Sequence, residues 1–167
     1  NTPTEVFETR YPWIVEEYAL RQDSGGAGEH RGGLSISKTM LCTGDVMISQ
    51  MTNKHIRTSW GLKEGKESIS GATLFQAKGA NDWQTIKQAF GKVSSSKYSN
   101  VPIHPDERVS VKAPGGGGFG SPAKRDHAAI VEDVLEGYIS REKAAEDYGF
   151  EESWIAKYAP GEVAAAE

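Results

Sequence analysis

The chain has 167 residues, the usual size of one domain, so it can bury one sizeable core. Its hydrophobic content of 37% and its 19 glycines argue against a long helical bundle and favour short strands with many turns. A net charge of -4, from 19 basic and 23 acidic residues without a basic block, argues against nucleic acid as a partner.

Neither a membrane span nor an export signal is expected from these residues. No run approaches the ~20 apolar residues that cross a bilayer, and the first residues lack the charged and apolar regions of a signal peptide. Cys42 is the only cysteine, which excludes an internal disulfide and a zinc site built from thiolates. We therefore expect no membrane partner and a reducing, cytoplasmic location.

The first predicted elements are a short helix and a strand. Thr2 is the expected N-cap of the helix, which has Pro3 at its first position and ends near Arg10, before Pro12. Residues 13–20 are rich in aromatic and β-branched types and predict a strand. The apolar side chains that alternate along this strand are Ile14, Tyr18 and Leu20.

A glycine-rich loop and a hairpin are predicted next. Residues 23–33 contain five glycines, which permit positive φ or close backbone approach, and they separate two strands. Residues 46–51 form an apolar stretch after a Thr-Gly-Asp turn, and pairing with residues 34–42 would make a hairpin. The face of residues 34–42 that we expect to be buried carries Leu34, Ile36, Met40 and Cys42.

The middle of the chain continues the predicted sheet. Trp60 is the expected buried anchor of a polar loop, and residues 71–77 predict a strand. Residues 78–100 fit a short helix or a covering loop equally well. Residues 108–113 alternate again and predict a strand that leads into the glycine run at 115–118.

Two amphipathic helices are predicted after Asp126. In the first, Val131, Val134, Leu135 and Tyr138 follow the i, i+3, i+4, i+7 spacing. Ser140 caps the second, residues 141–148, whose exit is Gly149.

The expected fold class is α+β. It is mainly an antiparallel β-sheet domain with glycine-rich loops and a C-terminal pair of amphipathic helices. The expected parts are a β-rich domain with a short N-terminal helix at 1–121, a helical hairpin at 122–150 that packs on it or on a partner, and a C-terminal tail at 151–167.

The first candidate for ligand binding is Arg31, with Gly32 and Gly33 beside it. An arginine on a permissive loop could clamp a carboxylate or a phosphate with its planar fork. It could equally pair with Asp23 or Glu29 to hold the loop, and this structural reading is favoured because surface ion pairs greatly outnumber ligand clamps.

The second candidate is the glycine run, made of Gly115, Gly116, Gly117 and Gly118. Such a run can present backbone N–H groups to an anion when it leads into a helix. The following Gly-Ser-Pro lacks the lysine and hydroxyl of a phosphate loop, so a sharp crossing from sheet to helix is the favoured reading.

No catalytic or metal-binding residue is predicted. The four histidines have no second ligand at a metal-binding spacing. Cys42 lies on an apolar strand face, where a buried inert thiol is the usual outcome. There is no nucleophile elbow and no ordered triad, so the residues alone predict a glycine-rich sheet domain without its own catalytic machinery.

The order of five segments resembles the C-terminal region of the hydantoinase B, 5-oxoprolinase and acetone or acetophenone carboxylase subunit family. The resemblance covers residues 1 to about 150 and departs from the family's pattern at residues 52–58 and 78–100. The segments are NTPTEVFETRYPW, LRQDSGGAGEHRGGL, SWGLKEGK, VKAPGGGGFGSPAKRD and VEDVLEGYISREKAAEDYG.

This resemblance implies a role inside a larger ATP-dependent enzyme. The implied partners are a hydantoinase A-like subunit that uses ATP and the larger part of the hydantoinase B-like subunit. ATP and a divalent metal are expected in those partners, and no cofactor is expected in this chain. Because the chain begins inside the region of resemblance, it is interpreted as a small subunit or a split C-terminal part.

Three functions remain open from the sequence. The favoured one is a mainly structural part of a multi-subunit ketone carboxylase of the acetone or acetophenone type. The first alternative is a component of an ATP-dependent cyclic amide hydrolase that opens hydantoin or oxoproline rings. The second alternative, from another class, is an independent anion-binding module.

Overall fold

The computed structural model describes residues 2–159, which form two compact units by their internal contacts. We call the first the sheet unit; it holds the chain up to Ala19, Ile36–Arg57 and Ser70–Ala113. We call the second the loop-helix unit; it holds Leu20–Ser35, Thr58–Ile69 and the chain from Pro114 onward. This division differs from the predicted boundary at residue 121, because the two glycine-rich loops group with the C-terminal helices.

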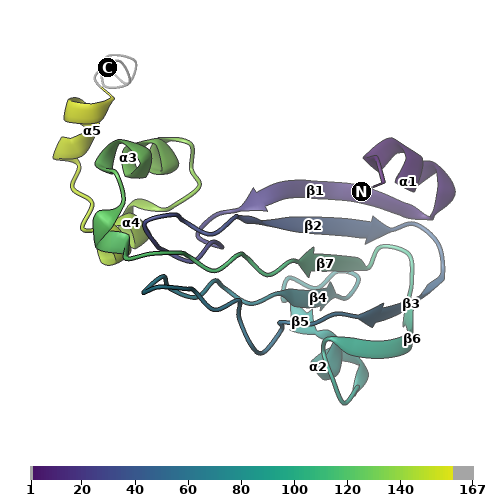
Figure 1. The fold of residues 1–167 in the computed structure, drawn as a ribbon. Coiled ribbons are helices and arrows are strands. Elements are labelled where there is room, and N and C mark those ends of the chain that lie inside the picture. Colours follow the sequence, from purple (N-terminus) through teal and green to yellow (C-terminus); the bar gives the residue numbers. More distant parts are fainter. Residues whose placement is uncertain (1, 160–167) are drawn as a thin grey trace. The chain divides into compact units, whose positions relative to one another are not determined.

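The main sheet of the sheet unit is antiparallel, with strand order β1-β2-β7-β4-β5 (Figure 1). Its register pairs Met40 of β2 and Phe75 of β4 with the same residue of the central strand, Val109. The strands are β1 (Trp13–Arg21), β2 (Ser35–Cys42), β7 (Arg108–Lys112), β4 (Ala72–Gln76) and β5 (Gln84–Thr85). The strands predicted at 13–20, 71–77 and 108–113 are thereby confirmed.

A second sheet of two strands pairs β3 (Val46–Met51) with β6 (Lys97–Ile103). The predicted hairpin between residues 34–42 and 46–51 is therefore wrong, since β2 pairs with β7 instead. The Thr-Gly-Asp connection leads from one sheet to the other rather than turning back on itself. No local pattern predicts β6, because Lys97–Asn100 is mostly polar and short-range patterns do not report a partner such as Val46, which pairs with Ile103.

Two helices belong to the sheet unit, α1 (Thr4–Arg10) and α2 (Ile86–Phe90). Helix α1 begins later than predicted, because Pro3 is its N-cap, with a non-helical ψ of 144°, and no side chain caps it. Helix α2 shows that the helical reading of residues 78–100 holds in part, and Thr85 closes a capping box with Gln88. The core of this unit consists of Trp13, Cys42, Phe75, Ile86, Val101, Ile103 and Val109.

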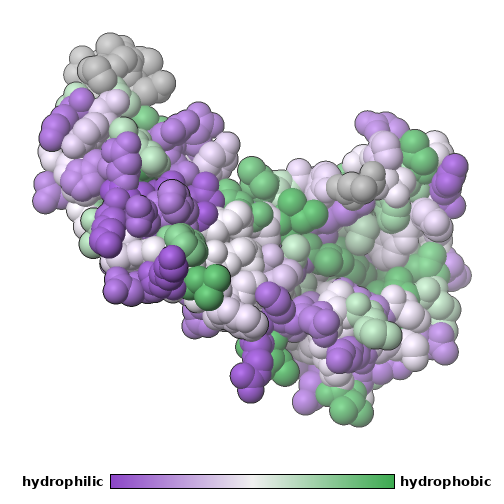
Figure 2. Space-filling view, viewed as in Figure 1, coloured by the Kyte–Doolittle hydropathy of each residue, from purple (hydrophilic) through white to green (hydrophobic). Residues whose placement is uncertain are grey.

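The buried face of β2 differs from the predicted one at its start. Ser37 and Thr39 are buried, whereas Ile36 is 39% exposed. A buried polar residue is tolerated at Thr39 because its Oγ1 donates to Ser110 Oγ of the paired strand β7 at 3.0 Å. The apolar residues predicted to alternate on β1 are exposed as well, and Figure 2 shows hydrophobic side chains over β1 and β2.

The described part of the loop-helix unit contains three α-helices, α3 (His127–Leu135), α4 (Arg141–Tyr148) and α5 (Ser153–Tyr158), preceded by a 3-10 turn at Pro122–Lys124. The predicted helix pair and the α+β fold class are confirmed. The apolar stripe predicted for the first helix is wrong at Leu135, which is 37% exposed, and at Tyr138, which lies beyond the end of α3. Asp126 and Ser140 cap α3 and α4 through their side chains, and Gly149 ends α4 with a φ of 70°. The core of this unit consists of Ile130, Val131, Val134, Ile139, Ala144, Phe150 and Ile155.

The predicted C-terminal tail at 151–167 is only partly described. Helix α5 lies inside it, and its Ile155 is buried in the helical core, so the prediction of a tail is wrong for residues 153–158. Residues 160–167 lie outside the described residues. Within residues 2–159, no helix has the length and apolar character to cross a membrane.

Candidate functional site

The predicted site residues lie on three glycine-rich segments of the loop-helix unit, 24–33, 58–69 and 114–120. Backbone hydrogen bonds join all three: Gly26 N donates to Gly116 O at 2.8 Å, and Leu62 N donates to Gly118 O at 2.9 Å. A third bond closes the set, from Lys66 N to Ala27 O at 2.7 Å. The structure thus brings the two predicted glycine groups, at 32–33 and 115–118, into one network.

Glycine is required here because the backbones touch. A Cβ on Gly32 would lie 1.9 Å from Gly116 O, and a Cβ on Gly117 would lie 2.0 Å from Trp60 O. Any side chain at either position would push the segments apart. The glycines therefore serve a close backbone packing that spacing in the sequence did not predict.

Three of the four N–H groups of the glycine run already have partners in this chain. Gly115 N donates to Ile69 O at 3.3 Å, Gly116 N to Gly33 O at 2.9 Å and Gly118 N to Lys66 O at 2.9 Å. These bonds describe a packed crossing between β7 and the C-terminal helices, which is the reading that the sequence favoured. Ligand contact by this run stays a prediction.

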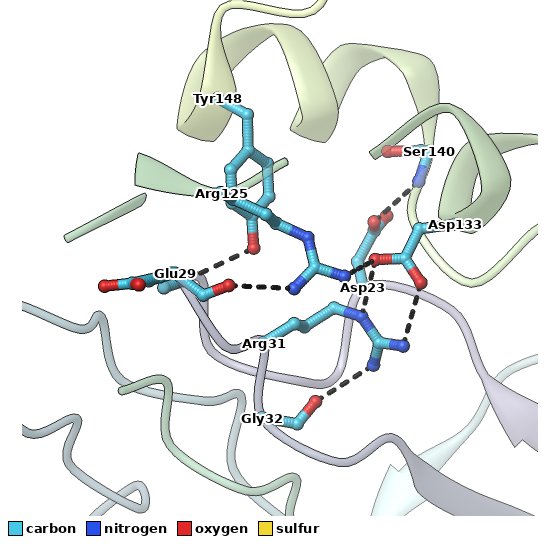
Figure 3. A network of polar contacts seen from close by, with 9 residues as sticks. Asp23, Glu29, Arg31, Gly32, Arg125, Asp133, Ser140 and Tyr148 are labelled. Carbon is cyan, nitrogen blue, oxygen red and sulfur yellow. Dashed lines mark hydrogen bonds and ion pairs between the residues drawn. The ribbon is translucent and has the colours of Figure 1, made fainter. Parts of the chain in front are cut away.

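Arg31 is held by a carboxylate far away in the sequence (Figure 3). Its Nε and Nη2 bind the two Asp133 oxygens at 2.9 and 3.0 Å, and its Nη1 donates to Gly32 O at 2.9 Å. Asp133 lies on α3, and neither predicted partner, Asp23 nor Glu29, forms this pair. Asp23 instead accepts a bond from Ser140 N at the start of α4, at 2.7 Å.

A second arginine, missed by the sequence analysis, completes the cluster. Arg125 Nη2 binds Asp133 Oδ2 at 2.6 Å, and its Nη1 donates to Glu29 O at 3.3 Å. The side chains of Arg125 and Asp133 are only 12% and 8% exposed. The sequence contained no usable signal for this pair, because Asp133 is not one of the apolar positions predicted for its helix. Its burial on α3 is visible only in the structure, and a buried carboxylate needs such partners.

Tyr148 of α4 borders this cluster (Figure 3). Gly28 N donates to its hydroxyl oxygen at 3.3 Å, and the Arg125 guanidinium lies 5.8 Å from its ring centroid. Burial raises the pKa of Tyr148 above its ordinary value.

A further buried carboxylate ties α4 to the loops. Lys66 Nζ lies 2.6 Å from Asp147 Oδ1, and the Asp147 side chain is 5% exposed. Lys143 approaches the other Asp147 oxygen at 3.4 Å. Each of the two predicted helices therefore contributes one buried aspartate that binds a cation from a glycine-rich segment.

The chemistry of the Arg31, Arg125 and Asp133 cluster suits it to holding segments of the chain together. Arg31 and Arg125 share Asp133, so the three groups carry one net positive charge, and a guanidinium neither gives nor takes protons at ordinary pH. Within residues 2–159, no group of three or more His, Cys, Asp or Glu side chains could hold a metal ion.

Cys42 is buried in the sheet unit, as predicted, and burial raises the pKa of its thiol.

Hollows are also present in each of the two units. One, of about 300 Å³, is in the loop-helix unit and is lined by Glu29, Lys63, Glu64, Phe119, Gly120, Ser121 and Lys124. The other, of about 260 Å³, is in the sheet unit and is lined by His55, Ser94, Ser95 and Ser96 among others. Burial lowers the pKa of His55.

The predicted anchor role of Trp60 is wrong, because its side chain is 74% exposed.

Comparison with known proteins identifies the family. The model of the family described as hydantoinase B/oxoprolinase matches residues 1–122, which confirms the resemblance. The chain belongs to the hydantoinase B/oxoprolinase family. It is 32% identical over 155 residues to the caprolactamase subunit beta of Pseudomonas jessenii, a match that covers 87% of this chain and 24% of that relative.

Two solved structures share the fold. The ATP-dependent caprolactamase of Pseudomonas jessenii matches all of this chain and 28% of its own, with 23% identity and a TM-score of 0.75. An acetone carboxylase in its nucleotide-free state matches 99% of this chain and 26% of its own, with 19% identity and a TM-score of 0.70. The chain thus spans about a quarter of the length of these proteins.

Proposed function

We propose that this chain is a structural part of a hydantoinase B-like subunit that works inside an ATP-dependent enzyme. The observation that carries the proposal is the match to the caprolactamase subunit beta, at 32% identity over a quarter of that relative. The glycine-rich segments also support it. The arginines and the backbone N–H groups of the candidate site already form ion pairs and hydrogen bonds that pack these segments within the chain.

We propose that the enzyme hydrolyses a cyclic amide. Caprolactam is the lactam in the name of a relative that this chain resembles in sequence and in fold. ATP would activate the poorly electrophilic amide carbonyl by phosphorylation, so that water can then open the ring. Ketone carboxylation, which the sequence alone favoured, is the second candidate, supported by the likeness to acetone carboxylase.

We propose that ATP and a divalent metal bind to the partners, a hydantoinase A-like subunit and the larger part of the B-like subunit. The glycine run fits a phosphate poorly, because three of its four N–H groups donate to carbonyls in this chain. Arg31 and Arg125 are likewise engaged by Asp133. The residues of this chain would then hold their neighbours in place rather than touch the reacting atoms.

The test begins with the protein purified from its source together with every chain that copurifies. Native mass spectrometry and peptide sequencing identify the partners, and release of ADP is then measured with a lactam, a hydantoin or 5-oxoproline, and separately with acetone or acetophenone plus bicarbonate. We expect A-like and B-like chains and ADP release that depends on a cyclic amide. Release that depends on ketone and bicarbonate would select the carboxylase, and a lone stable monomer would favour the anion-binding module.

A further inference from the structure

Three large apolar side chains stand exposed on the glycine-rich segments. Trp60 is 74% exposed, Leu62 is 58% exposed and Phe119 is 41% exposed, and we call these three residues the Trp60 patch. They lie on adjoining backbone: Leu62 and Phe119 form a β-bridge, and the Trp60 carbonyl lies against Gly117. A monomer rarely exposes a group of large apolar side chains together without a binding role.

The backbone that carries the patch is held by hydrogen bonds and contains two residues in a strained conformation. Lys63 and Glu64 have φ angles of 49° and 74°, which non-glycine residues rarely adopt, in a turn closed by Gly65 N donating to Leu62 O at 3.0 Å. Hydrogen bonds fix both ends of the turn, from Gly120 N to Leu62 O at 3.0 Å and from Gly118 N to Lys66 O at 2.9 Å. Strain that the surroundings maintain in this way is typical of functional surfaces.

Charged side chains surround the patch. Lys63 Nζ lies 5.2 Å from the centroid of the Phe119 ring, and the hollow of about 300 Å³ beside this ring also has Glu29, Glu64 and Lys124 in its wall. An aromatic and aliphatic centre with a charged rim is the usual arrangement of a protein interface hot spot. By contrast, the surface over α3 and α4 is mainly hydrophilic in Figure 2.

We infer that the Trp60 patch docks onto the larger part of the hydantoinase B-like subunit. The inference rests on the proposed function and names the surface that this assembly would use. In the caprolactamase subunit beta, the region that matches this chain makes up only 24% of the polypeptide. The rest of that polypeptide is covalently linked to the matching region and is therefore present beside it at a high effective concentration. The docking surface would offer an apolar pocket for Trp60 and charges that complement Lys63 and Glu64.

The experiment compares this chain alone with the same chain assembled with the larger part of the subunit. Hydroxyl-radical footprinting with mass spectrometry reports the oxidation rate of each exposed side chain. We expect assembly to slow oxidation of Trp60 and Phe119 at least fivefold. Ile56 and Val93 of the sheet unit, which are 93% and 95% exposed, serve as internal references for exposed apolar side chains.

Two pairs of variants measure how much the Trp60 patch contributes to the affinity of this chain for the larger part of the subunit. Trp60→Ser and Leu62→Ser are each expected to weaken binding of the larger part at least tenfold, whereas Ile56→Ser and Val93→Ser should change it less than twofold. Thermal unfolding of each variant alone checks that its fold is kept, which exposed positions favour.

The outcomes separate this inference from the proposed function. If the complex forms and uses ATP while Trp60 is oxidised at the rate of the free chain, the docking inference is overturned and the proposed function stands. Protection of Trp60 in a homodimer of this chain, seen by native mass spectrometry, also overturns it. A chain that binds no A-like or B-like partner overturns both.

Discussion

Asp133 has an unusual position for a carboxylate, since it lies on a helix face and binds two arginines at once. Its side chain is 8% exposed, and those of Arg31 and Arg125 are 16% and 12% exposed. Burying three charged groups is costly unless all remain paired, so the pairing of each depends on the others.

Replacing Asp133 by Asn should therefore destabilise the loop-helix unit strongly. The change leaves two guanidiniums buried with no counter-charge, and we expect a loss of about 3 to 5 kcal/mol in the free energy of unfolding. Urea denaturation measures this loss. The matched control is Glu16→Gln, which breaks the bidentate pair with Arg108, where the side chains are 32% and 34% exposed.

For this control we expect a loss of about 1 kcal/mol or less, because a partly exposed pair is screened by solvent. Equal losses for the two variants would contradict the argument from burial.

Tyr98 makes the stability of the sheet unit depend on pH. Its hydroxyl donates to Gln50 Oε1 at 2.6 Å, and burial raises the pKa of Tyr98 from 10.0 to about 12. Between these two values the folded chain keeps a proton that the unfolded chain releases. The free energy of unfolding should therefore fall as pH rises from 10 to 12, by at most about 1.4 kcal/mol per pH unit.

The variant Tyr98→Phe should make this decline shallower. At neutral pH it should cost about 1 kcal/mol for the lost hydrogen bond, while Gln50 keeps its bond from Thr73 at 2.8 Å. Urea unfolding at a series of pH values from 7 to 11 compares the two proteins. Curves that stay parallel above pH 10 would show that Tyr98 does not carry the effect.

At the scale of elements, the structure separates two kinds of glycine that look alike in the sequence. Gly32 packs against the backbone of Gly116, whereas a Cβ on Gly33 would meet no atom within 4 Å. Neighbouring glycines of one loop thus differ in whether a side chain fits.

The substitution Gly32→Ala should destabilise the loop-helix unit by about 3 kcal/mol, because the three segments must separate to admit a methyl group. Gly33→Ala is the control, and it should change stability by about 0.5 kcal/mol or less. Thermal or urea unfolding followed by circular dichroism measures both. A loss at Gly33 as large as that at Gly32 would contradict the packing argument.

The helices were more predictable than the pairing of the strands, because helix signals are local and strand pairing joins distant segments. Ser140, Asp126 and Gly149 act within one turn of their helix, so their roles could be predicted from adjacent residues. The pairing of β3 with β6 joins Val46 to Ile103, and no local signal distinguishes that partner from β2. The candidate site behaves like the sheets, because Arg31 could be named but its partner lies 102 positions away.

At the scale of the whole molecule, each unit has its own hydrophobic core, and the chain spans about a quarter of the length of its relatives. A small chain with many glycines buries a modest core, so binding to a partner would add to its stability. The exposed apolar side chains of β1 and of the Trp60 patch are what such a part would present to the rest of its enzyme. The assembly and ATP experiments above belong to this scale.

The sequence by itself determined the family, the α+β class and the capping of α4 by Ser140 and Gly149, because these depend on ordered motifs and local backbone chemistry. Only the tertiary structure decided which strands pair, that Asp133 holds Arg31 and Arg125, and that the glycines pack backbone against backbone. Those features arise from contacts between segments distant in the chain. Their energy depends on burial and geometry, which a linear pattern does not contain.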